Sequence, residues 1–200
     1  METFPIYDEC GIRIQATGKT GTGESSVFYN PRMSIGRDFV VAAACASRHI
    51  YSGKRPFTVL DGFCASGIVG FRIKRALGEY CSLSLNDASR DVIRCAASNA
   101  RANEISVEEF HNRFAESVLM DKVFDFVTID PFGSPSPFLD ALFRQLPKDG
   151  IAVLTATDTA TLYGSAPQAS LRHYGGVSCR QGTPVVISTL AVCSFLIPPC

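Results

Sequence analysis

The sequence predicts an α/β domain with a mostly parallel sheet and helices on both of its faces. Short apolar runs that end at turn residues alternate with helix-like segments along most of the chain. Strands and helices that alternate in this way favour parallel strands covered on both sides. The 200 residues are enough for one domain of ordinary size with a substantial core.

Five strands are expected, each a short apolar or alternating run bounded by turn signals. They cover residues 57–60, 83–86, 107–111, 124–129 and 151–155. Helices are expected at residues 34–51, 71–77, 90–103, 115–120 and 136–146. Ser34 stands at the start of the first of these helices and Ser89 just before the third, so both are candidate caps.

The composition is that of a soluble globular protein. There are 19 basic and 19 acidic residues, so any RNA-binding surface must be a local patch. Eight cysteines without a Cys-x-x-Cys pair favour reduced thiols in an intracellular protein over a zinc site. The first residues lack a signal-peptide pattern. The longest apolar run, 185–197, is shorter than the roughly 20 residues that cross a bilayer, so no membrane association is expected.

Residues 1–50 are expected to form an N-terminal segment that contributes to a ligand site. A cluster of Gly, Thr and Ser at residues 17–26 is typical of a mobile loop. Asn30-Pro31 is a turn signal that presents Arg32 beside two aromatic residues. Arg32 is either a solvated surface charge or a clamp for an anionic group, such as a ligand carboxylate.

The first predicted strand leads into a turn of small residues, 61–70, and then a helix. Small residues such as Gly67 let the backbone approach a ligand, and the helix N-terminus offers unpaired N–H groups. The pattern is not Gly-x-Gly-x-x-Gly. Asp61 at the strand end would repel a pyrophosphate but suits a cationic or hydroxyl-rich ligand. The alternative is a plain turn between a strand and a helix.

Asp87 follows the second predicted strand. An acid at this position binds ribose hydroxyls in doubly wound sheets, because a carboxylate accepts from both hydroxyls. The alternative role for Asp87 is a helix cap. The preceding glycine turn favours ribose binding.

Asp130-Pro131-Phe132-Gly133 follows an apolar strand, at the sheet edge where ligands bind in open α/β sheets. Pro131 ends strand pairing, and Gly133 allows a close backbone approach. A carboxylate that accepts an N–H bond from the amine of a nucleobase stabilises the charge that develops when the amine attacks. Phe132 can stack on the base. The alternative is a strand that simply ends in a proline turn.

Taken together, these motifs resemble the class I S-adenosylmethionine-dependent methyltransferases, and most closely the tRNA guanine-26 N2-dimethyltransferase family. The resemblance covers about residues 25–176. It rests on segments 27–33 (VFYNPRM), 61–70, 86–87, 129–140 (IDPFGSPSPFLD), 155–158 and 171–175. It implies a Rossmann-like methyltransferase core at residues 51–176, incomplete at its C-terminal end, with residues 177–200 as a divergent apolar tail.

The resemblance also implies the reaction and the residues that perform it. One or two methyl groups would pass from S-adenosylmethionine to the N2 amine of a tRNA guanine, which must be flipped out of its stack. No metal is needed, because the sulfonium is an activated donor. The implied catalytic residues are Asp130 and Phe132. The implied donor-binding residues are Arg32, Asp61, Gly67, Asp87, Phe114 and Ala115. The implied substrate contacts are Pro131, Gly133 and Asp158.

The sequence departs from the family at three places. The family usually has an arginine where Val69 stands, and Asp-Ala where Phe114-Ala115 stands. Beyond Gly176 the resemblance is expected to stop, which would leave an open sheet edge and a chain with weak or no activity. A truncated or inactive relative that binds a nucleoside, RNA or a protein partner is therefore an alternative. A dinucleotide oxidoreductase is disfavoured by the missing Gly-x-Gly-x-x-Gly. If the source is eukaryotic, the nucleus, cytoplasm and mitochondrion all remain open, and no oligomeric state is predicted.

Overall fold

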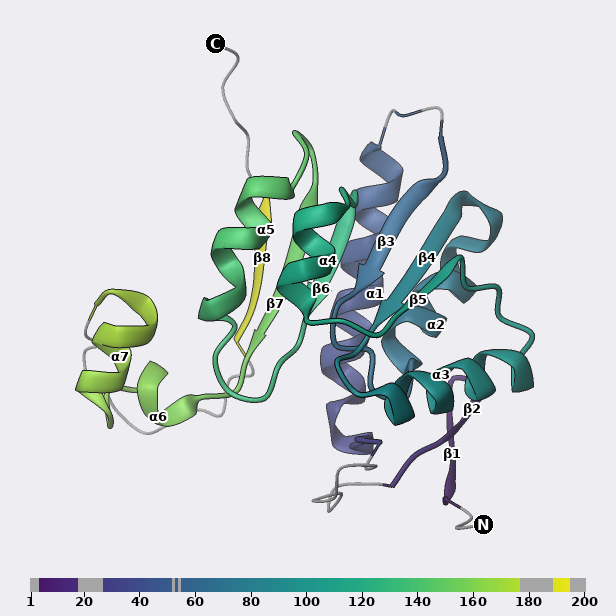
Figure 1. The fold of residues 1–200 in the computed structure, drawn as a ribbon, viewed down its shortest axis with the longest axis horizontal. Coiled ribbons are helices and arrows are strands. Elements are labelled where there is room, and N and C mark those ends of the chain that lie inside the picture. Colours follow the sequence, from purple (N-terminus) through teal and green to yellow (C-terminus); the bar gives the residue numbers. More distant parts are fainter. Residues whose placement is uncertain (1–3, 18–26, 52, 54, 177–188, 195–200) are drawn as a thin grey trace.

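The computed structural model describes residues 4–17, 27–51, 53, 55–176 and 189–194 (Figure 1). The strands are β1 Ile6–Glu9, β2 Ile12–Gln15, β3 Phe57–Asp61, β4 Cys81–Asn86, β5 Glu109–His111, β6 Phe126–Ile129, β7 Ile151–Ala156 and β8 Thr189–Ser194. The α-helices are α1 Ser34–Ile50, α2 Ile68–Leu77, α3 Arg90–Ala102, α4 Ala115–Asp121, α5 Leu139–Gln145, α6 Thr159–Leu162 and α7 Pro167–Tyr174. Three 3₁₀ turns are η1 Pro31–Met33, η2 Gly78–Tyr80 and η3 Ser136–Phe138.

The described strands form a six-stranded sheet in the order β5-β4-β3-β6-β7-β8 and a separate β1-β2 hairpin. Strands β3 to β7 pair in parallel, which confirms the predicted fold class. The chain runs outward from β3 to β5, returns to the centre at β6 and continues to β7. The strand order therefore reverses between β3 and β6. In open α/β sheets the carboxyl ends of two such strands flank the ligand crevice.

Helices cover both faces of the sheet because alternate strand residues point to opposite sides. On β3, Val59 packs into the cluster that contains apolar residues of α1, α2 and α3, whereas Leu60 packs into the cluster with α4 and α5. On β7, Val153 and Leu154 divide in the same way. Figure 1 shows α4 and α5 in front of the sheet and α1 behind it. No helix within the described ranges is long and apolar enough to cross a membrane.

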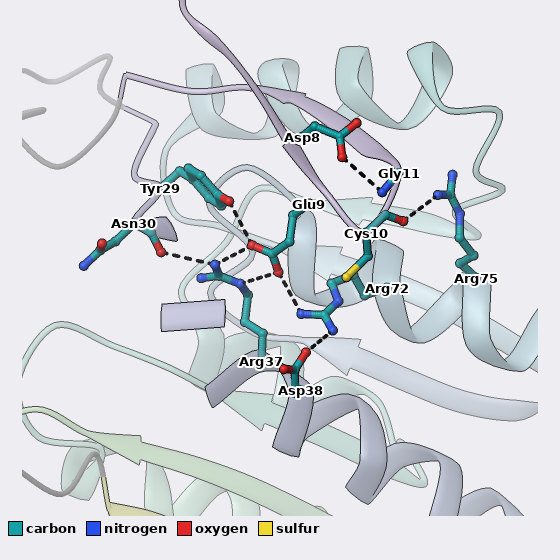
Figure 2. A network of polar contacts seen from close by, with 10 residues as sticks. All are labelled: Asp8, Glu9, Cys10, Gly11, Tyr29, Asn30, Arg37, Asp38, Arg72 and Arg75. Carbon is teal, nitrogen blue, oxygen red and sulfur yellow. Dashed lines mark hydrogen bonds and ion pairs between the residues drawn. The ribbon is translucent and has the colours of Figure 1, made fainter. Parts of the chain in front are cut away.

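A buried ion network ties the N-terminal hairpin to the helices behind the sheet (Figure 2). Glu9, at the end of β1 and only 7% exposed, accepts hydrogen bonds from the Tyr29 hydroxyl at 2.9 Å, Arg37 Nε at 2.9 Å and Arg72 Nη1 at 2.7 Å. Arg72 also pairs with Asp38 on α1. Burial raises the pKa of Glu9, but the hydrogen bonds from Arg37, Tyr29 and Arg72 outweigh it and hold the pKa below its ordinary value.

The two predicted helix caps have different outcomes. Ser89 does cap α3, because its hydroxyl accepts the Val92 N–H at 3.4 Å. The expected cap at Ser34 is wrong. Proline at position 31 begins a 3₁₀ turn that runs directly into α1, so Ser34 is already helical. Asn30 caps this turn instead, and its side chain accepts the Arg32 N–H at 3.1 Å.

The predicted boundaries differ from the structure at several further elements: β4 begins two residues earlier than expected, at Cys81, and β5 two residues later, at Glu109. The expected helix at residues 136–146 begins as the 3₁₀ turn η3 and becomes α-helical only from Leu139. The β6 strand begins at Phe126, two residues later than expected. The carboxylate of Asp125, just before it, accepts hydrogen bonds from Arg55 Nη1 and Nη2, both at 2.8 Å. Helix α2 begins three residues earlier than expected, at Ile68.

The apolar tail does not leave the β7 edge open, contrary to the expectation from the sequence. Strand β8 pairs antiparallel with the whole of β7, from Ile151 opposite Ser194 to Ala156 opposite Thr189. The apolar tail therefore contains a strand. The sequence did not predict it, because one short apolar run does not show which other strand it pairs with. Most of the predicted loop at residues 17–26 lies outside the described residues.

Candidate active site

The turn between β3 and α2 places a carboxylate and a helix N-terminus side by side at the crevice. The Asp61 side chain is 3% exposed and accepts the Gly70 N–H of α2 at 3.1 Å. Gly67 has φ +88°, a conformation that side chains disfavour, and it makes the turn into the helix. At Gly62 an added Cβ would lie 2.8 Å from Ile129 Cδ1 and 3.1 Å from the Thr128 carbonyl oxygen, so the turn packs closely against β6 here.

Burial dominates the titration of Asp61. It raises the pKa of this carboxyl to about 7, the Gly70 N–H opposes the rise, and the negative charges of Asp130 and Asp87 add to it. Carboxylates at the ends of β3, β4 and β6 therefore share one electrostatic environment. The sequence predicted these acids one by one, and the parallel sheet brings them together.

Asp61→Asn should change how stability depends on pH. In the folded chain Asp61 keeps a proton up to about pH 7, whereas an unfolded aspartate loses it near pH 4. The folded state therefore binds more protons between these values, and its stability falls as the pH rises through that window. Asp61→Asn lacks this carboxyl, so it should gain stability over the parent as the pH rises. The difference in the free energy of unfolding between the variant and the parent should be about 2–3 kcal/mol larger at pH 8 than at pH 5.

Urea titrations at the two pH values measure this difference. Asp121→Asn is the matched control, because that carboxylate is 56% exposed and its replacement should shift both values equally. A constant difference between Asp61→Asn and the parent across the pH range would contradict the buried, protonated Asp61.

Asp87 lies just past β4 with acceptor sites to spare. Its Oδ1 accepts the Ser89 N–H at 2.9 Å and its Oδ2 the Ala65 N–H at 3.4 Å. Two carboxylate oxygens offer about four lone-pair sites, so two remain for a ligand. Burial raises the pKa of Asp87, and the N–H bonds from Ser89 and Ala65 oppose the rise. Ser89 is the cap of α3, and Asp87 accepts the N–H of that residue. The ribose-binding role of Asp87 stays a prediction.

Two further predicted donor-binding residues lie at the end of β5. Phe114 is 73% exposed, whereas Ala115, the first residue of α4, is 3% exposed. The Arg113 N–H donates to Asn86 Oδ1 at 3.3 Å, which ties this segment to the end of β4. Val69, where the family usually has an arginine, is partly buried against the apolar cluster of α1 to α3.

Asp130 follows β6 directly, and the loop after it presents one exposed aromatic side chain, Phe132. Burial raises the pKa of Asp130, and a hydrogen bond from Thr155 and the charge of Arg37 oppose the rise. Pro131 is buried, and Gly133 has φ +89°. Phe132 is 84% exposed, and its ring stands edge-on to that of Phe28 with the centroids 5.3 Å apart. An aromatic ring this exposed has a face available to a ligand.

The N-terminal segment approaches the same site. Arg32 is exposed and has no ion-pair partner among the described residues. Its loop is held by Arg37, which donates to the Asn30 carbonyl at 3.1 Å and bonds the buried Glu9 (Figure 2). Sequence reasoning missed Arg37. It gave no signal because its partner is 28 residues away and both are ordinary charged residues in isolation.

Asp158 follows β7 and its two oxygens already have partners. Oδ1 accepts the Tyr174 hydroxyl at 2.8 Å, and Oδ2 lies 3.4 Å from His173 Nδ1. Its side chain is 12% exposed. Asp158 is therefore engaged with α7, and its role as a substrate contact stays a prediction. Within the part of the chain that the structure describes, no group of three His, Cys, Asp or Glu is arranged to hold a metal ion.

The sequence profile of the N2,N2-dimethylguanosine tRNA methyltransferase family matches residues 10–184. The chain belongs to that family. The match begins before residue 25 and continues past Gly176, so the expected limits of the resemblance were too narrow, and the family pattern reaches into the tail.

Similar proteins agree with the family assignment. A tRNA (guanine(26)-N(2))-dimethyltransferase of Methanocaldococcus jannaschii is 37% identical over 78% of this chain and 43% of its own length. The Pyrobaculum aerophilum protein with the same name is 35% identical over 94% of this chain and 51% of its length. The solved structure of Trm1 from Pyrococcus horikoshii with S-adenosyl-L-methionine matches with a TM-score of 0.73 and 30% identity, over 89% of this chain and 49% of that one. This chain thus spans about half, or less, of the length of these relatives.

Proposed function

We propose that this chain takes part in methyl transfer from S-adenosyl-L-methionine to the exocyclic N2 of guanine 26 in tRNA. The observation that carries the proposal is the meeting of two groups of residues at the carboxyl ends of neighbouring parallel strands, β4, β3 and β6. The Asp87 carboxylate and the turn after β3 stand on one side, and Asp130 with the exposed Phe132 ring stands on the other. The names of the relatives supply the substrate and the position.

The donor pocket has residues that fit S-adenosylmethionine. Asp87 has free acceptor sites for the two ribose hydroxyls. The charges of Asp87 and Asp130 lie close enough to raise the pKa of Asp61, and together they create a negative potential that suits a sulfonium cation. The Ser66 hydroxyl, in the turn after β3, is buried without a hydrogen-bond partner in the described structure, so a polar ligand group there would satisfy it. Arg32 is free to bind the donor carboxylate.

The chain's own residues would hold the guanine for the reaction. S-adenosylmethionine supplies an activated methyl group when bound. The Asp130 carboxylate accepts an N–H bond from the guanine amine, which localises the nitrogen lone pair and stabilises the positive charge that develops there. Phe132 stacks on the base and fixes its plane, with Pro131 and Gly133 shaping the loop beside it.

A non-catalytic relative is the second candidate, and two observations favour it. Val69 packs against the core in place of a family arginine, and the exposed Phe114 stands where the family has an acid. Val69 is in the first turn of α2, directly after the turn that follows β3, and Phe114 follows β5. Such a relative would bind a nucleoside, RNA or a protein partner without transferring a methyl group.

Calorimetric titration and a methyl-transfer assay separate these functions. S-adenosylmethionine should bind and NAD should not, because the turn after β3 lacks the glycine pattern for a pyrophosphate. Labelled methyl transfer to unmodified tRNA should then be measured for the 200-residue chain and for the chain joined to the C-terminal half of a relative. Donor binding without transfer by either protein would favour the non-catalytic relative, and NAD binding alone would overturn both.

A further inference from the structure

Phe132 and Gly133 form the tip of a loop between two buried prolines, Pro131 and Pro135. Phe132 is 84% exposed and Gly133 adopts a positive φ, so burial does not fix the tip itself. Loops with few buried contacts open locally at low free energy unless hydrogen bonds hold them. The position of the Phe132 ring therefore depends on the hydrogen bonds made by the residues that follow it.

The first set of bonds comes from the segment after β7. The Gly133 N–H donates to the Thr157 hydroxyl at 2.9 Å, and the Thr157 N–H donates to the Gly133 carbonyl at 2.9 Å. Thr155, at the end of β7, bonds the Asp130 side chain. Asp130 and Gly133 are thus both attached to the neighbouring strand end.

The second set reaches α7 through a chain of hydroxyl groups. Ser134 Oγ donates to the Tyr174 hydroxyl at 3.0 Å, and that hydroxyl donates to Asp158 Oδ1 at 2.8 Å. Ser134 Oγ also accepts the Ser136 N–H at 3.2 Å. Each hydroxyl donates once and accepts once, so the chain runs in one direction and ends on a carboxylate. Hydrogen bonds in series polarise one another, and a bond to a charged acceptor is stronger than a neutral one.

The end of α7 is built to hold Tyr174 in place. Gly175 closes the helix with φ +68° and donates to the Leu171 carbonyl at 3.1 Å. The Ser170 hydroxyl donates to the Gly176 carbonyl at 2.8 Å. Burial raises the pKa of Tyr174, the bond from Ser134 lowers it and the Asp158 carboxylate raises it again, so the hydroxyl keeps the proton that it donates.

We propose that Tyr174 is a positioning residue, which holds the loop of residues 131–136 in place through the chain of bonds from Ser134 to Asp158. Helix α7 then acts on the reaction without touching the donor or the base. In this proposal Asp158 accepts the last hydrogen bond of the chain and does not contact the substrate. Only the catalytic consequence rests on the proposed function, because the anchoring of the loop is a property of the protein alone.

Hydrogen exchange in the 200-residue chain tests the anchoring. Tyr174→Phe keeps the ring and removes the hydroxyl, and should raise the exchange rate of the Gly133 amide about tenfold, the effect of losing one bond to a charged group. The amides of β3 should exchange as in the parent, which shows that the sheet is intact. Tyr80→Phe is the matched control, since Tyr80 is 67% exposed at the opposite end of the sheet.

A second variant shows whether the hydroxyls act as one unit. Ser134→Ala breaks the same chain of bonds from the loop side, and stands in if Tyr174→Phe disturbs α7. Ser134→Ala also removes the acceptor of the Ser136 N–H, so it should raise exchange at Gly133 by itself. In the Tyr174→Phe background it should add less than it does alone, because the bond between Ser134 and Tyr174 is already broken. Two effects that multiply, or an unchanged rate in Tyr174→Phe, would overturn the proposal.

The catalytic consequence has its own readout. If tRNA methylation is detected, Tyr174→Phe should raise KM for tRNA or lower kcat about tenfold, with donor affinity unchanged. If Tyr174→Phe raises amide exchange in the loop but leaves kcat and KM at the parent values, the hydrogen bonds of Tyr174 do not contribute to the reaction. If neither the 200-residue chain nor the chain joined to the C-terminal half of a relative transfers a methyl group, the proposed function fails, while the exchange result still decides the anchoring.

Discussion

Asp130→Asn is expected to lower methyl transfer about 10²–10⁴-fold and to leave S-adenosylmethionine binding nearly unchanged. The amide keeps the shape of the side chain but lacks the charge that stabilises the attacking amine. The hydrogen bonds that hold Asp87 come from the Ala65 and Ser89 N–H groups and do not involve Asp130. Rates should be measured with saturating donor and unmodified tRNA, in the longest protein that shows activity.

The pH profile gives an independent check on Asp130. Burial raises its pKa, and the acceptor must be ionised, so the parent rate should fall on the acid side at a pH above the ordinary carboxyl pKa. The residual rate of Asp130→Asn should lack that acid limb. Asp140→Asn is the control, because that carboxylate lies nearby in the chain and is 77% exposed. If Asp130→Asn binds the donor normally and transfers methyl groups at nearly the parent rate, Asp130 is not the acceptor of the guanine N–H bond.

Asp87→Ala should weaken donor binding by about 2–4 kcal/mol, since two charged hydrogen bonds of roughly 1.5–3 kcal/mol each are lost without full additivity. That loss corresponds to roughly 30- to 1,000-fold in Kd. The measurement is calorimetric titration with S-adenosylmethionine. Asp91→Ala is the matched control, because Asp91 lies four residues on in α3, is 52% exposed and pairs with Arg94. Equal affinities for a folded Asp87→Ala protein and the parent would rule out the ribose role.

The sheet and the strand-end acids were predictable because their signals are local. Runs such as residues 57–60 and 151–155 carry the periodicity of buried strands, and parallel pairing brings their carboxyl ends to one edge. Asp61, Asp87 and Asp130 each follow such a run, so their meeting could be expected from the order of the elements. The raised pKa values could not, because they depend on how deeply each carboxyl is buried.

The interactions that hold the site were not predictable because they join distant residues. Glu9 and Arg37 are 28 residues apart, and Ser134 and Tyr174 are 40 apart. Either member of each pair, taken alone, is an ordinary polar residue. Strand β8 was missed for a related reason. An apolar run in the tail favours association with some edge, but the sequence does not say that β7 is that edge.

Methyl transfer to two matched tRNAs tests the central claim most directly. One tRNA carries guanine at position 26, and the other carries inosine, which lacks the N2 amine but keeps the rest of the base. The protein, alone and joined to the C-terminal half of a relative, is incubated with labelled S-adenosylmethionine at low salt, where phosphate contacts are strongest. Our account predicts N2-methylated guanosine from the first tRNA and no label in the second. Equal labelling of both tRNAs, or label in any other nucleoside, would contradict it.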